Sequence, residues 1–280
     1  MKFGIMSLDF KRLTIEETFR LAKIYGFDGV EIFGTRCHLY PGDYSADVAK
    51  NIIHLQNTYH LEIPMYSPLA LNLPICICSP FEKERSDGIE YYKKAIKIAD
   101  DIGCERILVV ADHPGYFTPD SVIWTNLVES MKEICAAAHG TRVQVTIEPL
   151  TPMESPVVST VDHCVKLLQD VGDEHLYAMM DIVPPTIVKE PISKYFDMLG
   201  DRLNYAHICN NDGITDAHLR LENGVIPVPD VINVLSKHGY DGYVTTELYS
   251  ELYYDPELML SNTARCLKNY LNELDIKHHF

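Results

Sequence analysis

The sequence is short of positive charge. It has 24 Lys and Arg residues against 40 Asp and Glu residues, which gives a formal net charge of −16. Negative charge of this size repels phosphate backbones and anionic lipid surfaces, although a local basic pocket could still accept an anionic substrate. We therefore expect neither nucleic acid nor a membrane as a partner.

Regularly spaced cysteines and long apolar runs are also missing. The eight cysteines are scattered and include no CxxC pair, so we expect reduced thiols and not a disulfide framework. The apolar stretch 1–6 is closely followed by the charged residues Asp9 and Lys11. It is far too short for a signal or membrane segment. The sequence thus predicts a cytoplasmic protein.

The composition is that of a compact enzyme-sized domain. Of the 280 residues, 46% are hydrophobic and 23% are charged, which is enough apolar material for a sizeable core. The length is close to the roughly 250 residues typical of a closed βα barrel. Because no Pro/Gly/Ser-rich linker or composition shift divides the chain, we expect one domain over residues 1–280.

Short apolar runs alternate with amphipathic helical stretches along the whole chain, which predicts parallel strands joined by helices. The apolar character of the runs is continuous, as in strands covered on both faces. The predicted strands are 2–7, 29–33, 62–66, 106–111, 143–149, 178–182, 204–209 and 243–248. Eight such units predict a (β/α)8 TIM barrel of the α/β class, whose active site is built by the loops after the strands.

Polar side chains end four consecutive predicted strands. They are Glu148, Asp181, His207 and Glu247. A carboxylate at the end of a buried strand is costly unless it is paired or bound to metal, so three of them with an imidazole imply one divalent cation. This donor set suits Mn, Co, Ni, Fe or Zn. The alternative is that each residue is an ordinary ion-pair or capping residue, which four in succession disfavour.

The sequence also resembles a known family. Segments 148–155, 190–191, 195–201 and 212–213, together with Asp216 and His218, are similar to those of the fructoselysine 3-epimerases. That family lies in the xylose isomerase-like barrel superfamily, beside the tagatose and psicose 3-epimerases. The resemblance implies that Glu148, Asp181, His207 and Glu247 hold the metal. It also implies that Glu148 and Glu247 act as the catalytic acid–base pair.

Epimerisation beside a carbonyl requires removal of a proton on one face, stabilisation of an enediolate and return of a proton on the other face. Further residues are candidates for substrate binding. Glu154 matches a family position that contacts the carbonyl end of the substrate, although a loop carboxylate facing water is the alternative. His113 is expected at the barrel mouth or as an organiser of its loop. Asp216 and His218 are expected to bind hydroxyls or to lie in a mobile loop.

Arg36 and His38 follow the second predicted strand and complete the substrate-binding candidates. A guanidinium such as that of Arg36 grips a carboxylate with two hydrogen bonds, so Arg36 is a candidate for an amino-acid-bearing substrate, or else a solvated surface residue. The tagatose and psicose enzymes carry a His and an Arg where this chain has Pro184 and Gly213. The resemblance thus favours a ketosamine over a free ketohexose.

The leading prediction is a metal-dependent 3-epimerase that interconverts fructoselysine and psicoselysine or acts on a related small sugar or sugar-amine. An aldose–ketose isomerase is the alternative within enzymes, since it uses the same metal but moves a proton on one face. An endonuclease of the same superfamily conflicts with the charge of −16, and a sugar-binding barrel without catalysis conflicts with the intact acid–base pair. The resemblance also implies self-association into a homo-oligomer.

Overall fold

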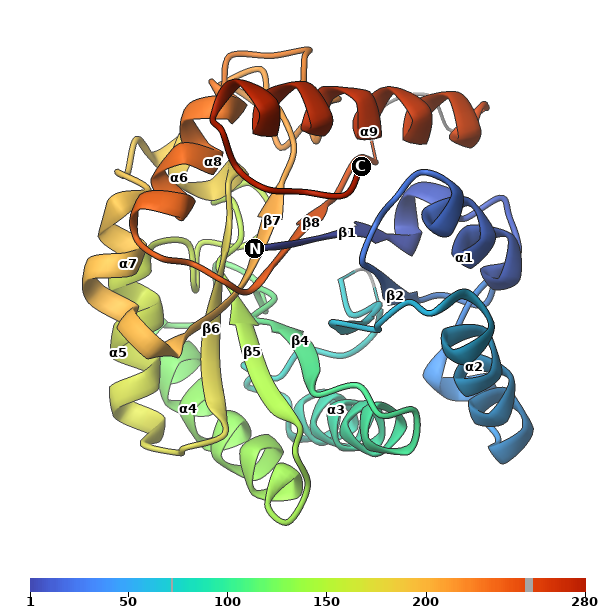
Figure 1. Cartoon of the computed structure of the whole chain (residues 1–280). Helices are drawn as coiled ribbons and strands as arrows, with labels where there is room; N and C mark the ends of the chain where they lie inside the picture. The colour runs from blue at the N-terminus through green and yellow to red at the C-terminus, as the bar shows by residue number, and fades with distance from the viewer. Residues whose placement is uncertain (72, 250–253) are drawn as a thin grey trace.

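A closed barrel of eight parallel strands forms the centre of the molecule (Figure 1). The computed structural model describes residues 1–71, 73–249 and 254–280. The strands are β1 (Lys2–Met6), β2 (Gly29–Gly34), β3 (Tyr66–Pro68), β4 (Arg106–Val110), β5 (Gln144–Glu148), β6 (Leu176–Asp181), β7 (Leu203–Ile208) and β8 (Tyr243–Thr246). They follow one another around the barrel in chain order, and β8 pairs with β1 to close it. The predicted TIM barrel is confirmed.

Helices form a ring around the strands (Figure 1). The α-helices of the described residues are α1 (Ile15–Ile24), α2 (Ala46–Tyr59), α3 (Glu82–Asp101), α4 (Asp120–Ala138), α5 (Val161–Val171), α6 (Val183–Val188), α7 (Ser193–Leu199), α8 (Val228–Lys237) and α9 (Pro256–Glu273). Short 3₁₀ segments add η1 (Ser7–Phe10), η2 (Pro41–Asp43) and η3 (Gly200–Arg202). Within the described parts of the chain, no helix combines the length and apolar character needed to cross a bilayer.

Hydroxyl side chains begin several of these helices. The Thr14 hydroxyl accepts a hydrogen bond from the Glu17 amide at 3.1 Å, and the Thr160 hydroxyl accepts one from the His163 amide at 3.2 Å. Each bond satisfies an amide that has no partner inside the helix. The helix starts are therefore fixed locally, which sets the length of the loops that precede α1 and α5.

The third strand lies further along the chain than predicted. Residues 62–65 still run beside β2, since the amides of Val30 and Ile32 donate to the carbonyls of Glu62 and Met65 at 3.0 and 3.1 Å. Pro64 has no amide hydrogen and interrupts the regular ladder. Regular pairing with β2 therefore begins only at Tyr66.

The core occupies both faces of the barrel wall. Ile5, Ile32, Val109 and Ile147 are fully buried in the strands, as expected for parallel strands covered on both sides. All eight strands end at the same rim, so polar residues at their carboxyl ends are brought to one place.

We predict that Gly29→Ala destabilises the barrel by about 1–3 kcal/mol, the usual cost of overpacking. A Cβ at this position would lie 2.9 Å from the Glu62 carbonyl oxygen and 3.0 Å from the Pro64 ring. Neither group can turn away, because the backbone and a proline ring are rigid. Urea unfolding followed by circular dichroism measures the change. If the free energy of unfolding of the variant is unaltered, β2 and the segment before β3 can move apart to accept the methyl group without loss of stability.

Candidate metal centre and active site

The structure brings together the four polar residues that end strands β5 to β8. Glu148 and Asp181 are the last residues of β5 and β6, His207 lies near the end of β7, and Glu247 follows β8. One possible ligand atom from each lies within 4.8 Å of the others. His207 Nδ1 is 3.2 Å from Glu148 Oε1 and 3.1 Å from Glu247 Oε2. The cluster therefore has the compactness that a single cation requires.

A fifth residue, Glu31 in β2, orients His207 from behind. His207 Nε2 is 2.9 Å from Glu31 Oε2, and the Glu31 side chain is fully buried. Ser67 and Tyr205 donate hydrogen bonds to the Glu31 carboxylate at 2.5 and 2.9 Å. With its Nε2 hydrogen engaged by Glu31, the imidazole is oriented so that Nδ1 faces Glu148 and Glu247, which is how histidines that bind metals are usually held. Our sequence prediction missed Glu31, although a carboxylate inside an apolar strand was its signal.

The electrostatics of the cluster favour a bound positive charge. Burial raises the pKa of Glu148 to about 7, although His207 opposes the shift. Burial acts in the same direction on Glu247, but the imidazoles of His207 and His218 outweigh it and hold the pKa of Glu247 below its usual range. Burial alone would lower the pKa of His207, whereas the carboxylates of Glu31 and Glu247 raise it well above its usual value.

The donor set fits a divalent metal. Two buried carboxylates, one half-buried carboxylate and one imidazole supply oxygen and nitrogen atoms at close range, and such a group is stable only when positive charge offsets it. Oxygen donors with one nitrogen are suitable for Mn, Co, Ni, Fe and Zn. The cluster could thus bind one divalent ion, as the sequence predicted.

Two further predicted residues lie beside this cluster. His218 Nε2 is 3.1 Å from Asp181 Oδ2 and 3.4 Å from Glu247 Oε2, and its ring lies 4.2 Å from that of Tyr249. Tyr249 in turn donates a hydrogen bond to Asp216 Oδ2 at 2.7 Å. The loop after β7 therefore reaches the metal cluster, and His218 is in direct contact with two of its carboxylates.

A cavity of about 370 Å³ opens above the cluster. Its acidic side includes Glu148, Glu154 and Glu247, and burial with the nearby carboxylate of Asp216 raises the pKa of Glu154 to about 8. The remaining wall is largely apolar and includes Leu8, Phe33, Leu69, Leu108 and Val110. A ligand in this cavity would meet acidic groups, hydrocarbon and the side chain of Lys11.

Three predicted substrate contacts do not line this cavity. The exposed Arg36 donates to Asp43 in its own loop at 2.9 Å. His38 is buried, and its Nε2 lies 3.3 Å from the Leu13 carbonyl oxygen. His113 lines a separate pocket next to α4, where its ring packs on Tyr116 at 4.8 Å. Local ion pairs and loop packing, which the sequence pattern does not reveal, determine these three positions.

The barrel and its acidic rim cluster define a βα-barrel enzyme. Residues 19–270 match the family described as xylose isomerase-like TIM barrel, and the chain belongs to that family. It is 36% identical to a fructoselysine 3-epimerase of Shigella flexneri over 92% of this chain and 94% of the relative. A probable ketose 3-epimerase of Synechocystis sp. is 24% identical, with coverage of 95% and 88%. The protein is an isomerase-class enzyme from a group of ketose 3-epimerases.

Solved structures show the same fold. A D-tagatose 3-epimerase-like protein superimposes with a TM-score of 0.84 at 21% identity, with 98% of each chain covered. The IOLI protein, whose structure has a binding zinc atom, gives a TM-score of 0.82 at 17% identity over 98% of this chain and 99% of that one. At these identities the likeness extends to the fold alone.

We predict that Glu31→Gln weakens divalent metal binding by about 10- to 100-fold, the usual effect of losing a carboxylate that orients a ligand histidine. The amide keeps the size of the side chain but removes the charge that holds His207. Isothermal titration with Mn²⁺ or Co²⁺ measures the affinity. Glu105→Gln, an exposed carboxylate at the opposite end of the barrel, is the matched control. Equal affinities in both variants would show that Glu31 does not act on the metal centre.

Proposed function

We propose that this protein is a divalent-metal-dependent 3-epimerase of ketosamines, with fructoselysine and psicoselysine as its substrate pair. The observation that carries the proposal is a pair of carboxylates, the buried Glu148 and the half-buried Glu247, which line one cavity and share contacts with His207. The 36% identity to a fructoselysine 3-epimerase supports the choice of substrate.

The two carboxylates are placed for proton transfer on two sides of a substrate. Glu148 comes from β5 and Glu247 follows β8, so β6 and β7 separate them around the barrel. In one direction of reaction, one carboxylate removes the C3 proton while the other acid returns a proton to the opposite face, and the roles exchange in the reverse direction. A divalent ion held by Glu148, Asp181, His207 and Glu247 would supply the positive charge that polarises the substrate carbonyl.

The surrounding residues support an amine-bearing sugar. Glu154 adds a carboxyl group to the cavity beyond the four cluster residues, and this group can form hydrogen bonds with the amine or the hydroxyls of a ketosamine. Pro184, where the resemblance places a histidine in enzymes of free ketohexoses, is buried in α6 and offers no side-chain hydrogen bond. The apolar wall is suited to the aliphatic arm that a lysine-derived ketosamine carries.

We predict that Glu148→Gln and Glu247→Gln each lower kcat by at least about 10²- to 10⁴-fold, since each loses a proton-transfer group. Proton NMR of the metal-loaded protein with fructoselysine in D₂O follows both the new epimer and deuterium at C3. Metal content is measured for every variant, which separates loss of metal from loss of proton transfer. Glu105→Gln, at the far end of the barrel, is the control.

The outcomes of this experiment distinguish the candidate reactions. Deuterium at C3 with a new ketosamine establishes the epimerase. Exchange at C1 or C2 with an aldose product would identify an aldose–ketose isomerase instead. No exchange with any ketosamine or ketose in the metal-loaded protein would overturn the proposal.

A further inference from the structure

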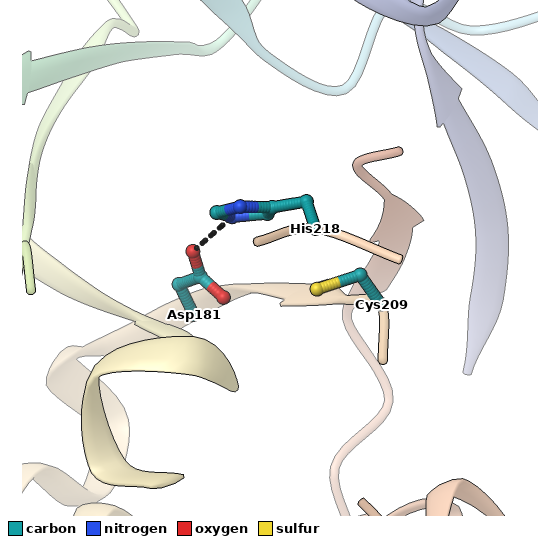
Figure 2. A group of neighbouring side chains, drawn as sticks. All are labelled: Asp181, Cys209 and His218. Carbon is teal, nitrogen blue, oxygen red and sulfur yellow. Dashed lines mark hydrogen bonds and ion pairs between the residues drawn. The ribbon is translucent and has the colours of Figure 1, made fainter. Parts of the chain in front are cut away.

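A second group of side chains that could bind a metal lies beside the first. Asp181, Cys209 and His218 each place one possible ligand atom within 4.8 Å of the other two. They are 5%, 1% and 4% exposed, respectively. In Figure 2 the sulfur of Cys209 and the ring of His218 both point toward the Asp181 carboxylate. Only Asp181 also belongs to the cluster described above.

The backbone holds these three side chains in place. Cys209 directly follows β7, and the next residue, Asn210, forms two backbone hydrogen bonds with Leu219 at 2.9 and 2.8 Å. That bridge fixes the loop segment that carries His218. Asp181 Oδ1 accepts a hydrogen bond from the Val183 amide at 2.9 Å. These contacts therefore hold the three side chains next to one another.

The orientation of His218 directs one ring nitrogen at Asp181. His218 Nδ1 is 3.2 Å from the Asp216 carbonyl oxygen, a contact that requires the ring hydrogen on Nδ1. Nε2 then faces Asp181 Oδ2 at 3.1 Å and Glu247 Oε2 at 3.4 Å. A proton on Nε2 satisfies this contact, and a metal ion that displaces the proton could bind the nitrogen and the Asp181 carboxylate together.

The donor atoms are those of a zinc-type site. Thiolate, imidazole and carboxylate are the ligands that bind Zn²⁺ and Co²⁺, whereas sulfur is a poor ligand for Mg²⁺, Ca²⁺ or Mn²⁺. Tetrahedral ligands at bond lengths of about 2.0–2.3 Å are roughly 3.3–3.8 Å apart. The His218 to Asp181 separation of 3.1 Å needs only a small outward movement to accept such an ion.

We propose that Asp181, Cys209 and His218 form a second divalent metal site, which takes Zn²⁺ or Co²⁺ and shares Asp181 with the first site. Binding releases the Cys209 thiol proton to solvent, because the thiolate is the ligand. Asp181 and His218 both line the cavity, so an ion held by them would lie beside the space that the substrate would occupy. Three protein ligands with one open position are typical of catalytic zinc. The inference goes beyond the proposed epimerase, which needs one ion.

Cobalt titration of the metal-free full-length protein tests the second site. We expect two Co²⁺ per chain and a near-ultraviolet charge-transfer band from thiolate to cobalt. Cys209→Ser, which preserves the size of the side chain, and Cys209→Ala should both lose the band and one equivalent of Co²⁺. Cys37→Ala is the control, because Cys37 is the exposed free cysteine and the obvious place for adventitious binding.

A wild-type protein without the band, or a band that survives Cys209→Ser and disappears in Cys37→Ala, would overturn the second site. These results are independent of turnover. Epimerisation by a protein that shows no thiolate band would leave the proposed function standing without the second ion. If the protein binds two equivalents of Co²⁺ and shows the Cys209-dependent band but does not epimerise ketosamines, the second site is supported and the proposed epimerase function is wrong.

Discussion

The imidazole of His207 lies between buried carboxylates on both sides, with Glu31 behind it and Glu148 and Glu247 in front. Buried negative charges repel one another strongly in a low dielectric, so this arrangement persists only with positive charge among them. A protonated imidazole supplies that charge in part, and a divalent ion supplies it fully. The barrel interior is apolar, so the carboxylates at its rim have to be balanced by positive charge nearby.

Strand register places the charged groups at the same height. Asp181 in β6 pairs with His207 in β7, and Val110 in β4 pairs with Glu148 in β5. Because the strands are parallel and the barrel is closed, no long loop is needed to bring these residues together. The loops are left to shape the cavity, and the loop after β7 supplies His218 beside the cluster.

The two proposed metal sites differ in the softness of their donors. The first has three carboxylates and an imidazole, while the second replaces two carboxylates with the Cys209 sulfur. Hard oxygen donors accept many divalent ions, whereas a thiolate narrows the choice toward zinc and cobalt. One carboxylate common to both, Asp181, means that the charge at one site influences the other.

The sequence by itself determined the barrel and the cluster Glu148, Asp181, His207 and Glu247, because apolar strands that end in polar residues follow simple periodic rules. The tertiary structure alone decided the role of Glu31, the start of the third strand after Pro64, and the meeting of Cys209 with His218. It also placed Arg36, His38 and His113 away from the cavity. These positions depend on loop paths and on contacts between residues far apart in the chain, which no local pattern encodes.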